Sequence, residues 1–397
     1  MYIHQLECAW MKHPFLTNQF KISQAAEIEK IRQHGIAYVS IDTDRGLDVA
    51  EAREDNHGAD ADALDLNLDL APPPPEPHET EFEPVTATSL LEELQVAKQV
   101  LSEANALMTE VMSDVRLGRM VNLEHMEPVV EQMIQSILRN PGALSCLGRV
   151  LQKDHYTFEH SINVSVLLVN FCHHLGLNRR TIRDAAIGAL LHDVGKVYTP
   201  DAVLNKAGPL TEAEYVQIRA HVGQGVDIVA SIPGISDLSL TVVAQHHEHM
   251  DGTGYPIGLQ GDQISQLGQM TAIVDVYEAL TSNRPYRPAM EPSLALQRIF
   301  NWSTQQFNTT LVQRFIQCVG IYPVGTLVLL DSGMIAIVTE TNPSNLLRPS
   351  VRIVLDSRSD LIVTPRDLNL AKPNVKERIV SSESAAKWKI NLGLYLA

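Results

Sequence analysis

Cysteine is scarce in this chain of 397 residues, and its pattern excludes two classes of small stabilised fold. The four cysteines, Cys8, Cys146, Cys172 and Cys318, are scattered and form no CxxC pair. A disulfide framework needs paired cysteines in an oxidising compartment, and a zinc knuckle needs closely spaced thiolates. We therefore interpret all four as reduced thiols of a cytoplasmic protein.

Long apolar segments are also absent. The longest apolar runs, such as Val166–Val169, stop well short of the ~20 residues needed to cross a bilayer. The amino-terminal residues Met1–Gln5 lack the basic and then apolar pattern of a secretion signal. We expect no membrane span and a cytoplasmic location.

Basic residues are few: 31 lysines and arginines stand against 47 acidic residues, for a formal net charge of −16. The acidity is local, because residues 42–83 hold 14 acidic side chains and two arginines, which leaves −4 for the rest of the chain. We expect no nucleic-acid polymer as a partner, and the acidic segment says little about the field around a site elsewhere. Residues 45–84, which include Pro72–Pro75, cannot bury a core and are predicted to form a linker.

The spacing of apolar residues divides the remaining sequence into three parts and indicates a mainly α protein. Residues 1–44 contain short apolar stretches, which predicts a small α/β or β-rich module that helices over 85–138 could extend. A helical period dominates residues 143–320 and predicts a helical bundle in the centre. From 321 to 397 the period changes to two, which predicts a small antiparallel β module.

Two doublets of metal-binding residue types lie in the helical part, His192-Asp193 and His246-His247. Adjacent residues on a helix point about 100° apart, because a turn holds 3.6 residues. Both members of a doublet can therefore bind metal only near a helix end, or by serving different metals of one cluster. The two doublets predict a polynuclear metal site, and we expect Gly195 to end the helix that carries the first of them.

Other histidines and one aspartate join the doublets. Nine of the fifteen histidines fall between His155 and His249, although any one of them taken singly is more often a core or helix-end residue. Asp275 lies in an apolar helical stretch, where a carboxylate is costly unless it is paired or coordinated, and no basic partner is evident nearby. Imidazole and carboxylate without thiolate favour iron, manganese, zinc or a similar first-row metal.

The order of these residues resembles the HD-GYP family of cyclic di-GMP phosphodiesterases, a branch of the HD metal-dependent phosphohydrolases. The likeness is carried by His192-Asp193, the spacing to His221, and the run from His246-His247-Glu248 to Gly254-Tyr255-Pro256, and it extends over roughly residues 143–320. Residues 1–44 resemble an uncharacterised domain that often precedes HD-GYP domains. The resemblance implies a bundle of the HD type in the centre of the chain.

The resemblance also implies roles for individual residues. Asp193 matches the carboxylate that bridges two metals, and Lys196 matches the lysine that faces the scissile phosphate, so these two are the expected catalytic residues. The expected metal ligands are His160, His192, Asp193, His221, His246, His247 and Asp275. The expected substrate-binding residues are Lys196, Gly254, Tyr255, Pro256, Glu278, Arg284 and Arg287.

Three positions depart from the family pattern. Glu278 stands where the family commonly has aspartate, which predicts a change in substrate positioning. Tyr156 stands where some members have a glutamate that binds a third metal, so we expect two divalent ions, iron or manganese. Ala207 stands in place of a common proline, which predicts only a small loss of loop rigidity.

The resulting prediction is hydrolysis of cyclic di-GMP to linear pGpG by a hydroxide that bridges the two metals, with further cleavage to GMP left open. One alternative is a cyclic di-GMP receptor or scaffold with weak catalysis. Another is an HD phosphohydrolase that acts on a different cyclic dinucleotide or nucleotide. Protein partners are expected through the amino-terminal module, and no residue pattern indicates an oligomeric state.

Overall fold

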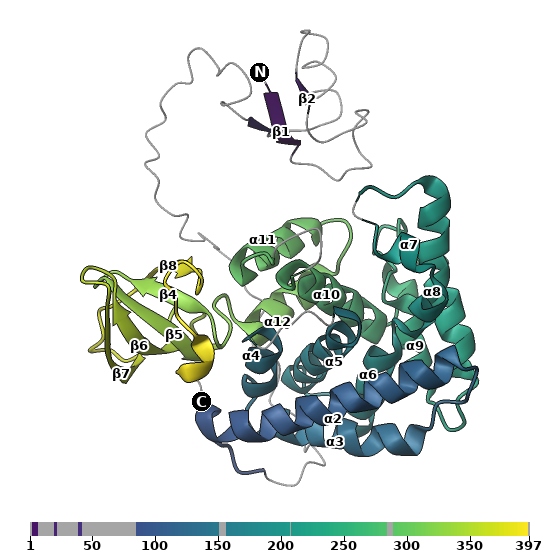
Figure 1. Cartoon of the computed structure of the whole chain (residues 1–397), viewed down its shortest axis with the longest axis horizontal. Coiled ribbons are helices and arrows are strands. Elements are labelled where there is room, and N and C mark those ends of the chain that lie inside the picture. The colour runs from purple at the N-terminus through teal and green to yellow at the C-terminus, as the bar shows by residue number, and fades with distance from the viewer. Residues whose placement is uncertain are drawn as a thin grey trace. The chain divides into compact units, whose positions relative to one another are not determined.

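The computed structural model of the protein describes residues 2–6, 20–21, 39–41, 85–150, 156–206, 208–283 and 289–395. The chain divides into two compact units, Met1–Asp62 and Ala63–Ala397. In the first unit, β1 (Tyr2–Leu6), β2 (Phe20–Lys21) and β3 (Val39–Ile41) form an antiparallel sheet in the order β2-β1-β3 (Figure 1). The linker predicted over 45–84 lies outside the described residues.

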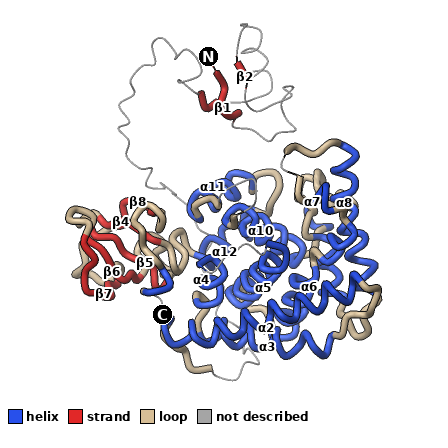
Figure 2. Tube along the Cα trace, viewed as in Figure 1, coloured by secondary structure: helices blue, strands red, loops and turns tan. Residues whose placement is uncertain are grey.

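Helices make up most of the described part of the second unit (Figure 2). They are α2 (Leu90–Arg116), α3 (Leu123–Arg139), α4 (Ala143–Val150), α5 (Tyr156–His174), α6 (Arg179–Leu191), η2 (Val194–Tyr198), α7 (Asp201–Leu204), α8 (Glu212–Ala230), α9 (Asp237–Gln245), η3 (Gly261–Gln263), α10 (Gln266–Thr281), α11 (Pro292–Trp302) and α12 (Thr309–Val319). Two of the long helices begin at capping boxes, in which Ser89 and Thr211 each exchange hydrogen bonds with the glutamate three residues later. Local sequence thus sets where these helices begin.

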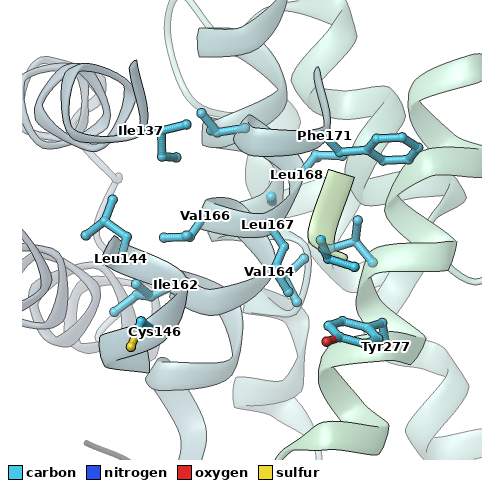
Figure 3. Close-up of a cluster of buried hydrophobic side chains, with 14 of the residues drawn as sticks. Ile137, Leu144, Cys146, Ile162, Val164, Val166, Leu167, Leu168, Phe171 and Tyr277 are labelled. Atoms are coloured by element: carbon cyan, nitrogen blue, oxygen red, sulfur yellow. The ribbon is translucent and has the colours of Figure 1, made fainter. Parts of the chain in front are cut away.

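An apolar cluster around α5 holds the bundle together (Figure 3). Leu168 and Phe171 of α5 are fully buried, among side chains of α3, α4 and α10. The ring of Phe315 in α12 meets Phe171 and Tyr277 edge to face, with centroids 5.3 and 5.2 Å away. These contacts fix α5 relative to α10, the two helices that carry His160 and Asp275.

A five-stranded antiparallel sheet follows the helices, in the order β7-β6-β5-β4-β8. Its core side chains, among them Val328, Ile335 and Ile337, are fully buried. Arg149 of α4 donates hydrogen bonds to the Val324 carbonyl and the Thr326 hydroxyl at the start of this module. The strands are β4 (Leu327–Leu330), β5 (Met334–Glu340), β6 (Ser350–Asp356), β7 (Leu361–Asn369) and β8 (Ile379–Glu383), followed by η4 (Leu392–Leu394).

The predicted fold class is confirmed: the chain is mainly α, with an antiparallel β module at the carboxyl end. Among the described helices, none is both long and apolar enough to cross a bilayer.

Candidate metal centre

Both doublets lie at helix ends, which is one of the two arrangements that the geometry of the α-helix allows. Helix α6 ends at Leu191, with His192 as its C-cap and Asp193 directly after it. Helix α9 ends at Gln245, with His246 as its C-cap. The carboxyl end of a helix carries partial negative charge, which favours a bound cation.

Gly195 has a different role from the one expected, because the helix ends before it. Helix α6 stops at Leu191 and the chain continues as η2, so the prediction that Gly195 ends this helix is wrong. A Cβ atom on Gly195 would lie 2.0 Å from the His221 carbonyl oxygen and 2.6 Å from the Gly225 nitrogen. Glycine is required because η2 lies directly on α8, and this close packing brings Asp193 beside His221.

The structure brings all seven expected ligands together in two adjoining groups. We call His160, His192 and Asp275 the inner group, because all three are buried. The outer group is more open to solvent and consists of Asp193, His221, His246 and His247. Within each group, the ligand atoms lie within 4.8 Å of one another.

Asp193 joins the two groups through its two carboxylate oxygens. Oδ2 lies 3.5 Å from His160 Nε2 and 3.3 Å from His192 Nε2, in the inner group. Oδ1 lies 3.4 Å from His221 Nε2 and 3.9 Å from His246 Nε2, in the outer group. Asp275 adds a second carboxylate, with Oδ1 3.1 Å from His160 Nε2 and Oδ2 3.7 Å from His247 Nδ1.

Three of the imidazoles are oriented by their own helices. Nδ1 of His192, His221 and His246 lies 2.7, 2.6 and 2.7 Å from the carbonyl oxygen three residues earlier. A carbonyl only accepts, so Nδ1 carries the proton, and in the neutral ring Nε2 presents a lone pair to the cluster. Such contacts fix the tautomer that a metal ligand needs.

Several inward-facing atoms lack the partners that a protein interior normally supplies. The Nε2 atoms of His221 and His246 face each other at 3.3 Å, where two lone pairs repel. Within the described part of the chain, His192 Nε2 and Asp193 Oδ1 are buried and accept no hydrogen bond. A cation between such atoms removes the mismatch, so the donor set fits divalent metal ions.

The electrostatics of the cluster keep His246 and His247 neutral and Asp193 ionised. Burial and the neighbouring His247 lower the pKa of His246 well below its usual range. Burial, only partly offset by Asp275, lowers the pKa of His247 to about 3. Burial opposes ionisation of Asp193, but His192 and Lys196 outweigh it and hold the carboxyl pKa well below its usual range. Neutral imidazoles and ionised carboxylates are the forms that bind metal.

His160 differs from the other histidines because a carboxylate lies behind it. Its Nδ1 contacts Glu278 Oε2, while Nε2 faces Asp193 and Asp275. Burial alone would lower the pKa of His160, but Glu278 and Asp275 outweigh burial and raise that pKa to about 10. Without metal, a proton on His160 therefore supplies positive charge that a metal would otherwise supply.

The position of Glu278 differs from the one that its expected substrate contact suggests. Its side chain is buried, and its carboxylate accepts hydrogen bonds from Asn163 and Ser282 as well as contacting His160. Substrate binding by Glu278 stays a prediction. The observed contact gives Glu278 a role in holding the His160 ring in place. Asn163, which no motif marked in the sequence, belongs to the same arrangement.

Lys196 lies at the edge of the cluster. Its Nζ is 2.5 Å from Asp193 Oδ2, and its side chain is 28% exposed. The ammonium group can therefore reach both the shared carboxylate and a molecule that enters from solvent.

The Gly254-Tyr255-Pro256 loop is shaped by a buried carboxylate. Glu248 accepts hydrogen bonds from the backbone N–H groups of Ile257, Gly258 and Leu259. A Cβ on Gly254 would lie 2.3 Å from the His249 nitrogen, so only glycine fits where the loop folds back. The ring of Tyr255 lies on that of His247, with centroids 4.6 Å apart.

Arg219 is a neighbour of this loop that sequence reasoning missed. Its guanidinium carbon lies 5.0 Å from the ring centre of Tyr255 and 5.9 Å from that of Tyr215. The residue is exposed on α8, two positions before His221. Nothing in the sequence separated Arg219 from an ordinary surface arginine, because its neighbour Tyr255 is far away along the chain. Ala207, Arg284 and Arg287 and the side chain of Tyr156 lie outside the described residues.

A helical bundle with a carboxylate between two groups of histidine and aspartate has a donor set that suits divalent metal ions. Three known protein families match separate parts of the chain. An HD domain matches residues 128–311, a domain of unknown function (DUF3391) matches residues 1–126, and a KOW domain associated with the HD domain matches residues 327–376.

Two similar proteins are named as phosphodiesterases of cyclic dinucleotides. The chain is 33% identical, over 98% of its length and 90% of the relative, to a cyclic di-GMP phosphodiesterase of Pseudomonas aeruginosa. It is 39% identical to a 3′3′-cGAMP-specific phosphodiesterase of Vibrio cholerae, over 35% of this chain and 32% of the relative. A solved HDGYP protein from Bdellovibrio bacteriovorus is 18% identical with a TM-score of 0.47, covering 59% of this chain and 73% of that one. The near full-length match to the Pseudomonas protein shows that the chain belongs to the HD-GYP family of HD-domain proteins.

Proposed function

We propose that the protein is a metal-dependent phosphodiesterase that hydrolyses cyclic di-GMP to pGpG. The observation that carries this proposal is the position of Asp193, whose two oxygens face two separate groups of ligand atoms. The name of the full-length Pseudomonas relative supports cyclic di-GMP as the substrate.

The proposed metal ligands are His160, His192, Asp193, His221, His246, His247 and Asp275, and the proposed ions are two of iron or manganese. Two such ions, when bound, activate water and neutralise charge on a phosphodiester. Lys196 adds a positive charge beside Asp193, where negative charge on phosphoryl oxygens would develop. No side-chain nucleophile is needed in this scheme.

Substrate contacts are proposed on the open side of the outer group. Tyr255 and its loop lie against His247, and Arg219 presents a guanidinium beside them. Arginine packs flat on an aromatic ring while its edge donates to phosphate or to a guanine base. We place Gly254, Pro256, Arg284 and Arg287 in the same pocket on the strength of the family motif.

These arginines can be tested by affinity. Loss of a charge-assisted contact should weaken binding by about 1.5–3 kcal/mol, either in Arg219→Met or in the Arg284→Ala/Arg287→Ala double variant. Metal content should stay at the wild-type level in both variants. Unchanged affinity for cyclic di-GMP would remove the substituted arginines from the substrate site.

Turnover of cyclic di-GMP by fully metallated protein tests the main proposal. The protein is purified without oxygen, loaded with Mn²⁺ or Fe²⁺, and incubated with cyclic di-GMP, 3′3′-cGAMP and cyclic di-AMP in parallel. Formation of pGpG, with about two metal ions per chain, supports the proposal. Binding of cyclic di-GMP without turnover supports the receptor alternative, and faster turnover of 3′3′-cGAMP supports the alternative suggested by the Vibrio relative.

The domain limits and the cellular setting are further parts of the proposal. We place the phosphodiesterase domain at 143–320, between the amino-terminal module with its linker and the β module at 321–397. Cyclic di-GMP is a second messenger inside bacteria, so the protein would act in the cytoplasm. Protein partners would bind the amino-terminal module, and pull-down with residues 1–44 deleted would show whether any partner depends on it.

A further inference from the structure

The four histidines nearest Asp193 are not supported in the same way. His192, His221 and His246 each direct Nδ1 to a neutral carbonyl oxygen of their own helix. His160 directs Nδ1 to the carboxylate of Glu278, which is 118 positions away in the sequence. A carboxylate behind an imidazole makes the ring a stronger donor than a carbonyl does, because it stabilises the positive charge that the ring gains on binding a metal.

Glu278 is built to stay in place. Its side chain is 5% exposed, and Oε1 accepts hydrogen bonds from Asn163 Nδ2 at 3.2 Å and Ser282 Oγ at 2.5 Å. Oε2 is left for His160. Ser282 lies just after α10, the helix that carries Glu278 and the ligand Asp275. Helix α10 thus carries Asp275, a member of the inner group, and also Glu278, which supports His160, another member of that group.

The charge around the two groups is also unequal. The inner group has Asp275 and shares Asp193, with Glu278 directly behind, whereas the outer group has Asp193 and three imidazoles and meets Asp275 only at the longer distance of 3.7 Å from His247. Lys196 contacts Asp193 Oδ2, the oxygen that faces the inner group, and therefore opposes a cation there. Two further carboxylates outweigh one ammonium group, so the inner position remains the more favourable one for a cation.

Exposure differs at one residue. The side chains of His160 and His192 are 9% and 0% exposed, and those of His221 and His246 are both 0% exposed. His247, whose side chain is 23% exposed, opens the outer group to solvent. Water can therefore compete for an ion in the outer group more easily than for one in the inner group.

We infer that Glu278 makes the two metal positions unequal, so that the inner position binds its ion first and tightly and the outer position loads second and exchanges. Glu278 is a positioning residue that acts through His160. This inference rests on the metal centre of the proposed function, and the enzyme's activity would then depend on the supply of free metal to the outer position.

Titration of the metal-free full-length protein with Mn²⁺ tests the inference without any substrate. Calorimetry should show two binding steps whose Kd values differ by at least ~10-fold, since a partner behind a ligand is typically worth 10–100-fold in metal affinity. Electron paramagnetic resonance should show an isolated Mn²⁺ ion at one equivalent and a coupled pair at two. In Glu278→Gln, the tighter step should weaken about 10–100-fold. In Glu278→Asp, which keeps the negative charge, the loss of Mn²⁺ affinity at the tighter step should be smaller.

Two further variants keep the test decisive. Glu93→Gln removes a buried carboxylate paired with Arg139, so it should lower stability but leave both metal steps unchanged. Asn163→Ala removes a hydrogen bond to Glu278 without touching His160, and it should weaken the same tight step by a few-fold if Glu278→Gln does not fold.

Two results would overturn the inference. One is binding of two Mn²⁺ ions to the wild type with a single Kd. The other is a tight step that stays within twofold in folded Glu278→Gln. If two equal ions bind and cyclic di-GMP is still hydrolysed, only this inference fails; if fewer than two ions bind, the dinuclear proposal fails as well.

Discussion

The centre of the helical bundle and the core of the β module are both largely buried, but they are filled in opposite ways. The helical centre buries His192, His221 and Asp275, whereas the module buries Val328 and Ile337. An apolar core is stabilising by itself, because it removes apolar surface from water. A buried group of ionisable side chains is costly until its members are paired or bind a cation. The helical centre is therefore composed as a binding site would be, and the β module has a core that serves stability.

The largest effect is expected when the shared carboxylate of the helical centre is removed. Asp193→Ala removes the carboxylate whose two oxygens lie 3.3 and 3.4 Å from histidines of the two ligand groups, so both ions should be lost. Turnover of cyclic di-GMP should fall at least about a thousandfold, equivalent to about 4 kcal/mol of transition-state stabilisation. Metal analysis and a turnover assay check this, with circular dichroism to show that the helices remain. One retained ion with near-normal turnover would contradict a shared role for Asp193.

The matching substitution in the β module should affect stability alone. Ile337→Ala opens a cavity at a fully buried position of β5 and should cost about 2–5 kcal/mol of unfolding free energy. Denaturant unfolding measures the loss, and metal content should remain at the wild-type value. A drop in metal content of the folded variant would show that the two cores are coupled.

A smaller effect is expected at the edge of the helical centre. Lys196→Ala removes a charge that is proposed to act on the developing phosphoryl charge rather than on the resting substrate. The variant should cleave cyclic di-GMP at least ~10-fold more slowly and bind it nearly as well as the wild type. Single-turnover kinetics and equilibrium binding separate the two quantities. Equal losses in rate and affinity would place Lys196 in substrate binding instead.

The smallest effect is expected on the outer strand of the β module. Ile362 in β7 is 70% exposed, so Ile362→Thr should change the unfolding free energy by less than ~0.5 kcal/mol. Denaturant unfolding beside Ile337→Ala gives the direct comparison. A loss of 2 kcal/mol or more would indicate that a partner surface normally covers this strand.

Strand prediction shows where sequence reasoning reached its limit in the module. The strands β4, β5 and β6 lie on apolar segments that alternate or are buried on both sides, and these segments gave the period of two that predicted the module. Strand β7 contains Pro365 and is exposed along most of its length, so no period-two pattern marks it. It lies at the edge of the sheet, where proline is tolerated because one side of the strand forms no ladder.

Local rules of the chain were enough to predict the mainly α class and the β module, and they limited the doublets to helix ends or to different metals of one cluster. Helix periodicity, and the cost of a lone carboxylate such as Asp275 in an apolar helix, are properties of short segments. The tertiary structure alone decided which oxygen of Asp193 faces which group, that Glu278 lies behind His160, and that Arg219 lies over Tyr255. The prediction for Gly195 was wrong for the same reason. Glycine is needed at this position because α8 packs closely against it, and not because a helix ends there. Such contacts join residues far apart in the sequence, and they exist only once the apolar packing of the helices has set the distances between them.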